Sequence, residues 1–85
     1  MPYDILRDSI AIEPAGDAVR FHLTVFGVEK TCRITDTALR SLDQEQGGDL
    51  LAIFDMHRLR IGQRAFAHLS RDLLVSGVVL RALDF

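Results

Sequence analysis

The sequence predicts a small α+β protein in two layers, an antiparallel β-sheet with two helices on one of its faces. Three observations favour this class. Apolar and polar side chains alternate over residues 19–25, which is the period of a half-buried strand. Residues 50–71 carry apolar side chains at helical spacing, and residues 78–85 are strongly apolar. A chain of 85 residues has room for a single domain, with a core that we place at about residues 19–85.

The first eighteen residues are compatible with an N-terminal edge strand. Ile10, Ala11 and Ile12 form a short apolar stretch, and residues 13–17 are rich in turn formers. The predicted order is therefore two strands plus this optional third, then two helices and a last strand. Two layers are favoured because they bury the apolar sides of both the sheet and the helices.

Residues 19–25 and 28–34 form a predicted β-hairpin. The second segment is rich in β-branched residues, and Gly27 can take the positive φ that a tight turn requires. A two-residue loop would place Phe21 opposite Cys32, so that both strands bury the same side. A G1 bulge with Gly27 in the left-handed region fits equally well, and it would shift the register by one residue.

Two helices are predicted after the hairpin. Thr35 is suited to be an N-cap, which indicates a short helix from about residue 36 to 45. The glycine pair at 47–48 ends this helix. Asp49 then caps a long amphipathic helix from residue 50 to about 71, whose apolar face suits packing onto the hairpin.

The closing strand is expected to follow a turn at Ser76 and Gly77 and to run from residue 78 to the end of the sequence. A last strand of this kind offers an open edge for pairing. Small domains bury a modest share of their surface, and self-association is a common way to compensate. A homodimer is therefore an early expectation.

Composition excludes several classes of protein. The formal net charge of −2 gives no overall attraction to nucleic acid or to an anionic membrane. Cys32 is the one cysteine, so no internal disulfide can form. No stretch reaches the roughly 18 apolar residues of a spanning helix. We expect a cytoplasmic protein without membrane contact.

Several residues carry a family resemblance: Val19-Arg20-Phe21 to Gly27, Thr31-Cys32-Arg33-Ile34-Thr35 entering Ala38-Leu39, and Phe54 with Arg58, Ile61 and Ala65. In order and spacing they resemble the small bacterial proteins grouped as domain of unknown function 1488 (DUF1488), from about residue 19 onward. The resemblance implies a hairpin, helices and a closing strand in a bacterial cytoplasmic protein, and it implies no activity. Gly62 stands where an acidic residue is common in the family, at a cost of about 1 kcal/mol in a helix interior.

Catalytic and metal-binding constellations are not visible. His57 and His68 are eleven residues apart on the long helix, roughly 16 Å along its axis, which is too far to share one metal. His22 lies on the non-core side of its strand. Cys32 alternates onto the apolar face, where a thiol stays protonated. We therefore expect no enzyme activity, no metal and no cofactor.

The long helix has one charge anomaly. Arg60, Arg64 and Arg71 share a stripe that could bind an anion such as a nucleic-acid phosphate. Alternatively, acidic residues of the same chain could neutralise the stripe within the fold, and the candidates are Asp43, Glu45 and Asp84. A solvated or ion-paired stripe is the commoner situation on amphipathic helices.

A second apolar line lies about opposite the predicted core face of the long helix, at Ala52, Met56, Leu59 and Phe66. Exposed side chains of this size form a patch that another surface normally covers. Two covers are compatible with the sequence, the apolar residues of the N-terminal segment and a second subunit. Met56, Leu59 and Phe66 are thus the candidate interface.

Two functions follow from these observations. The first is a non-enzymatic domain that acts through protein contacts, self-association included. The second is an accessory protein that binds nucleic acid or another anion through Arg60, Arg64 and Arg71.

Overall fold

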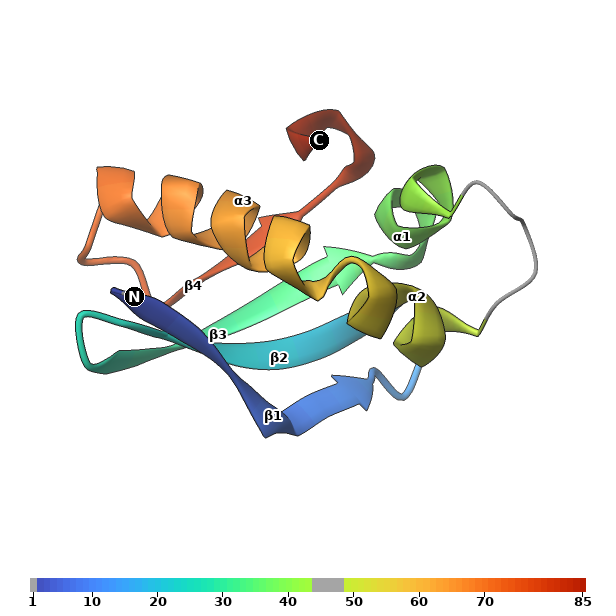
Figure 1. The fold of residues 1–85 in the computed structure, drawn as a ribbon, viewed down its shortest axis with the longest axis horizontal. Helices are drawn as coiled ribbons and strands as arrows, with labels where there is room; N and C mark the ends of the chain where they lie inside the picture. The colour runs from blue at the N-terminus through green and yellow to red at the C-terminus, as the bar shows by residue number, and fades with distance from the viewer. Residues whose placement is uncertain (1, 44–48) are drawn as a thin grey trace.

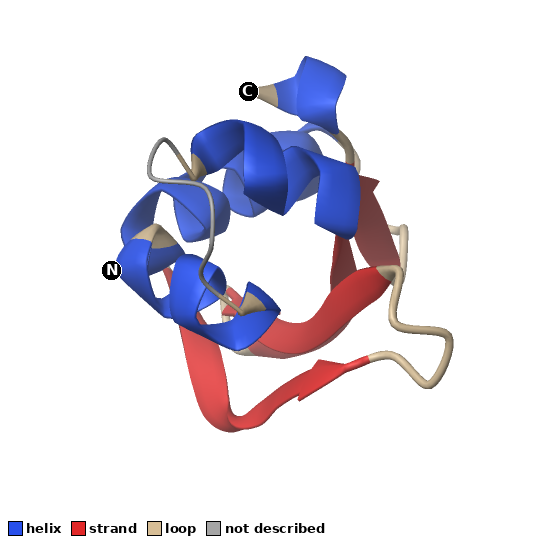
Figure 2. Cartoon of the chain, turned by 90° about the vertical axis from the view of Figure 1, so that its right-hand side faces the viewer, coloured by secondary structure: helices blue, strands red, loops and turns tan. Residues whose placement is uncertain are grey.

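The computed structural model describes residues 2–43 and 49–85 as an α+β fold in two layers, which confirms the predicted class (Figure 1; Figure 2). Its strands are β1 (Tyr3–Ile12), β2 (Ala18–Val25), β3 (Val28–Thr35) and β4 (Gly77–Leu80). Its helices are α1 (Asp36–Leu42), α2 (Leu50–Met56), α3 (Arg58–Arg71) and a 3₁₀ turn, η1 (Ala82–Asp84). The strands form one sheet in the order β1-β2-β3-β4, and the helices cover one of its faces.

The β2–β3 hairpin has the predicted register. Phe21 lies opposite Cys32 and Val25 opposite Val28, so the loop consists of Phe26 and Gly27 alone. Both loop residues have positive φ, 50° and 82°, as a type I′ turn requires. The two-residue turn is therefore the correct alternative, and the bulge is not formed.

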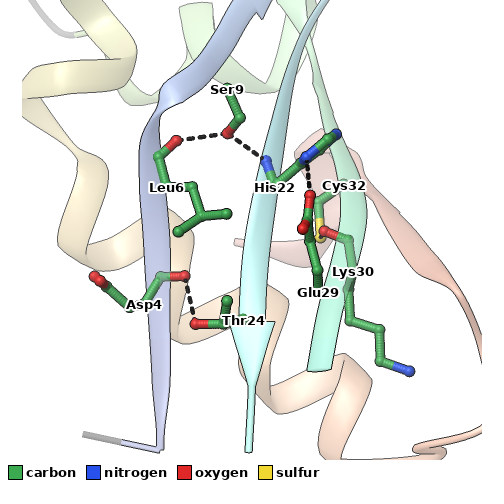
Figure 3. Close-up of polar contacts among 8 residues, drawn as sticks. All are labelled: Asp4, Leu6, Ser9, His22, Thr24, Glu29, Lys30 and Cys32. Carbon is green, nitrogen blue, oxygen red and sulfur yellow. Dashed lines mark hydrogen bonds and ion pairs between the residues drawn. The ribbon is translucent and has the colours of Figure 1, made fainter. Parts of the chain in front are cut away.

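Strand β1 begins earlier than the apolar stretch at 10–12 suggested, and it pairs antiparallel with β2 along the sheet edge. The register shifts between Leu6 and Ala11, so this edge strand carries a bulge. The Ser9 hydroxyl bridges the bulge (Figure 3): it donates to the Leu6 carbonyl at 2.5 Å and accepts the His22 backbone N–H at 2.8 Å.

Strand β4 differs from the prediction in direction and in length. It pairs parallel to β3, because three helices carry the chain back to the end of the sheet at which β3 starts. It also stops at Leu80 and is followed by η1, where the Asp84 carboxylate accepts the Arg81 backbone N–H at 2.7 Å. The prediction of a strand to residue 85 is therefore wrong beyond Leu80.

The long helix is interrupted. His57 has φ −107° and ψ 18°, and it separates α2 from α3. The apolar periodicity continues through this break, but α2 packs on β1 and β2 whereas α3 also reaches β4. Because strands of a sheet are twisted relative to one another, two shorter helices follow the surface better than one straight helix.

Both predicted N-caps are present. The Thr35 hydroxyl accepts the Ala38 N–H at 3.1 Å, and the Asp49 carboxylate accepts the Ala52 N–H at 2.8 Å. Helix α1 ends at Leu42, and the predicted glycine stop at 47–48 lies outside the described residues.

The core lies between sheet and helices and includes β1. Ile5 is buried with Phe21, Phe54 and other apolar residues, so the core starts before residue 19. Gly62 of α3 faces this strand, since a Cβ there would lie 3.3 Å from the Ile5 Cδ1 atom. The glycine lets α3 approach β1 closely, which explains its place in the helix. Among the described residues no helix has the length and apolarity needed to span a bilayer.

Candidate functional site

The predicted arginine stripe is on the surface of α3. Arg60, Arg64 and Arg71 are all exposed. The guanidinium of Arg60 lies 5.8 Å from the centre of the Phe85 ring, within the range of a cation–π contact. An open depression of about 560 Å³ lies along the same helix, lined by Leu59, Arg60, Gln63, Arg64 and Ala67.

The acidic residues expected to neutralise the stripe do not all reach it. Asp84 contacts the His68 Nε2 atom at 3.2 Å and caps η1. Asp43 lies at the C-cap of α1, and Glu45 lies outside the described residues. In the described part of the chain none of the three arginines of the stripe has an ion pair. Their charges are therefore available to a binding partner.

The candidate interface residues divide into two groups. Phe66 is half-buried, because the Tyr3 ring stacks on it at 4.7 Å and the Phe26 ring meets it edge-on at 5.9 Å. The N-terminal segment thus provides the cover for Phe66. No described residue covers Met56 and Leu59 in this way, and each is 72% exposed.

A second depression adjoins Leu59 on the other side. It measures about 440 Å³ and is lined by Tyr3, Asp4, Ile5, Arg7, Arg58, Leu59 and Gly62. It lies between β1 and the first turn of α3, and Arg58 is 3.4 Å from Asp55 at its rim. Leu59 therefore separates two depressions, each of which has arginine in its lining.

The histidines occupy three separate places. The His22 Nδ1 atom contacts the Glu29 carboxylate on the uncovered face of the sheet (Figure 3), and the His68 Nε2 atom of α3 contacts the Asp84 carboxylate of η1. His57 forms the break between α2 and α3. No group of three potential metal ligands is found among the described residues.

Cys32 is a packing residue. Its side chain is fully buried in the core. Burial raises the pKa of the thiol to about 11, against a smaller lowering by a backbone hydrogen bond from Val78. The group is a neutral thiol at physiological pH, which is a poor nucleophile.

Lys30 is a residue that the sequence reasoning missed. It lies on β3 at a core-facing position and is almost fully buried. Its ammonium donates to the carbonyl of Leu73 at 2.8 Å and to that of Val75 at 2.7 Å. The alternation of β3 could have revealed this burial, because Lys30 points to the same side of the strand as Cys32 and Ile34. A charge on that side must find buried partners.

A comparison with known families gives one match. Residues 6–74 match the family described as a protein of unknown function (DUF1488). No curated protein and no solved structure matches the chain. The matched range extends from β1 to the loop after α3, and so includes most of the fold. The chain therefore belongs to the DUF1488 family.

Proposed function

We propose that this protein is a non-enzymatic interaction module that binds another protein at the junction of α2 and α3. The contact surface, here called the Leu59 surface, consists of Met56, Leu59, Arg60, Gln63 and Arg64. The exposure of Leu59 between two depressions carries the proposal. The Leu59 side chain contributes little to the packing of the core, so the stability of the fold does not explain why this side chain is exposed to water. Methionine and arginine are also enriched in protein interfaces.

The charges of the Leu59 surface favour a partner with carboxylates. Arg60 and Arg64 have no ion pair in the described part of the chain, so an acidic surface could pair with them on binding. Contact between two copies of this surface would instead bring arginines of both copies together, and like charges across an interface are unfavourable. A different protein therefore fits this surface better than a second copy.

A photo-crosslinking experiment tests the proposal in the cells that express the protein. A photoreactive amino acid replaces Leu59 in one variant and Leu83 in the control, because Leu83 is also exposed but lies on η1. We expect a discrete adduct from position 59 that disappears in Arg60→Glu/Arg64→Glu. Identical adducts from both positions, or none from position 59, would refute the proposal.

Anion binding is the second candidate, and the row of Arg60, Arg64 and Arg71, none of which pairs with an acidic residue in the described ranges, favours it. The protein as a whole is acidic, so binding would depend on this local row. Fluorescence anisotropy with labelled DNA and RNA oligonucleotides at low salt provides the test. We expect Arg60→Glu/Arg64→Glu to weaken binding, while Arg20→Glu on the uncovered sheet face leaves it unchanged. No binding at low salt would remove this candidate.

A further inference from the structure

A second exposed apolar surface lies at the other end of α3. The β2–β3 turn and the loop between α3 and β4 are at the same end of the molecule (Figure 1), joined by the hydrogen bonds of Lys30. Large apolar side chains from both segments are exposed there: Phe26, Val28, Leu73, Leu74 and Val75. We call this set the apolar end. Leu59 and this end are separated by most of α3, roughly 18 Å at 1.5 Å per residue.

The loop that presents these side chains is held in place from inside. Lys30 binds the carbonyls of Leu73 and Val75, and the Asp72 carboxylate accepts the Leu74 N–H at 3.1 Å. The Thr31 N–H donates to the carbonyl of Ser76 at 3.0 Å. A loop that is already ordered loses little conformational entropy when it binds. The buried Lys30 thus fixes the loop that presents the exposed Leu74.

The charges around the apolar end are balanced, unlike those of the Leu59 surface. Its exposed charged neighbours along the chain are Arg71, Asp72 and Glu29; Glu29 contacts His22, which leaves Arg71 and Asp72 as one charge of each sign, and the ammonium of Lys30 is buried against carbonyl oxygens. A twofold contact sets the same patch against itself, so it needs charges that complement each other under that rotation. Arg71 of one copy can pair with Asp72 of the other. An anionic bilayer would instead need a cluster of cations, and one arginine does not supply it.

We propose that two copies of this chain associate through their apolar ends. Together the five side chains expose about as much area as three fully exposed apolar side chains would. At roughly 100 Å² for each of the three, this amounts to ~300 Å² per copy. Both copies together would bury roughly 600 Å² of apolar side-chain surface, below the ~1,000 Å² expected of a stable interface. The dimer is accordingly weak and concentration-dependent. It does not depend on the proposed partner of the Leu59 surface.

Sedimentation velocity over a range of concentrations tests the dimer with the full chain. Leu74 and Leu83 are 95% and 97% exposed, so Leu74→Glu and Leu83→Glu make the same change in equally exposed positions at different places. We expect the wild type and Leu83→Glu to dimerise as concentration rises. Leu74→Glu should associate at least about tenfold more weakly, because the carboxylate would be desolvated in the contact.

Three results would overturn the proposal. The first is a wild type that stays monomeric at millimolar concentration. The second is a Leu74→Glu variant that dimerises like the wild type, with circular dichroism showing that both are folded. The third is binding of the monomer to phosphatidylglycerol vesicles that Leu74→Glu abolishes, which would assign the apolar end to a lipid surface.

Discussion

The two ends of α3 present different surfaces. Near its start an exposed leucine lies beside Arg60 and Arg64, which have no ion pair within the described residues, and Gly62 lets β1 approach closely. At its last turn a rigid loop presents several apolar side chains with balanced charges at the rim. Charge excess suits a different partner of opposite charge, whereas charge balance permits a copy of the same surface. One short helix can therefore separate two kinds of contact.

The largest expected effect concerns the backbone at the apolar end. A Cβ on Gly77 would lie 1.6 Å from the carbonyl oxygen of Thr31, an atom that cannot move without separating β4 from β3. Gly77→Ala should lower the free energy of unfolding by about 3 kcal/mol or more, as measured by urea denaturation.

Gly62→Ala is the matched change at the other end of α3. Its Cβ would meet only the side chains of Ile5 and Tyr3, at 3.3 and 3.4 Å. The gain in helix propensity of about 1 kcal/mol should offset most of this crowding. Equal losses of stability in Gly77→Ala and Gly62→Ala would contradict the difference between a backbone and a side-chain contact.

The next effect concerns the buried lysine. Lys30→Met removes the donor to two carbonyls, and we expect the free energy of unfolding to fall by about 1–3 kcal/mol. Amide hydrogen exchange in the 72–76 loop should also accelerate, because the loop loses its anchor. Arg20→Met, a cation removed from the exposed sheet face, serves as the control. Unchanged loop exchange in Lys30→Met would show that the lysine does not order the loop.

A smaller effect on stability distinguishes the covered Phe66 from the exposed Leu59 within the predicted interface. Phe66→Ala should destabilise the fold by about 1–2 kcal/mol, because it removes the ring contacts with Tyr3 and Phe26. Leu59→Ala should change stability by less than about 0.5 kcal/mol, since that side chain is mostly in water. Thermal unfolding measures both. The reverse order would mean that Leu59 belongs to the core and not to a contact surface.

The smallest effect is that of salt. Raising the ionic strength should weaken binding at the Leu59 surface, where arginines face carboxylates or phosphates. Sodium sulfate should leave the dimer of the apolar ends unchanged or slightly stronger, because it favours burial of apolar area. Parallel titrations by anisotropy and sedimentation measure the two responses. A dimer that dissociates in salt would show that ion pairs such as that between Arg71 and Asp72, and not burial of apolar area, hold the two copies together.

Several expectations from sequence are confirmed because they depend on neighbouring residues. The alternation of Val19 to Val25 and the turn at Gly27 determine the hairpin and its register. Thr35 and Asp49 cap helices whose first N–H groups lie within three residues. The sequence also indicates that Arg60, Arg64 and Leu59 do not lie on the core-facing side of the helix, and all three are exposed in the structure.

Other features depend on contacts between residues far apart in the sequence. The parallel direction of β4 depends on where the helices bring the chain back, and the break at His57 depends on how α2 and α3 fit the twisted sheet. The cover of Phe66 comes from Tyr3, more than sixty residues earlier.

The sequence by itself determined the hairpin, the helix starts and the polar side of the long helix, because local periodicity and capping act over a few residues. Only the tertiary structure decided that Lys30 holds the loop at Leu73 and Val75, and that this loop lies at the same end of the molecule as the β2–β3 turn. Such a surface forms when segments some 45 residues apart meet, and no local pattern encodes that meeting.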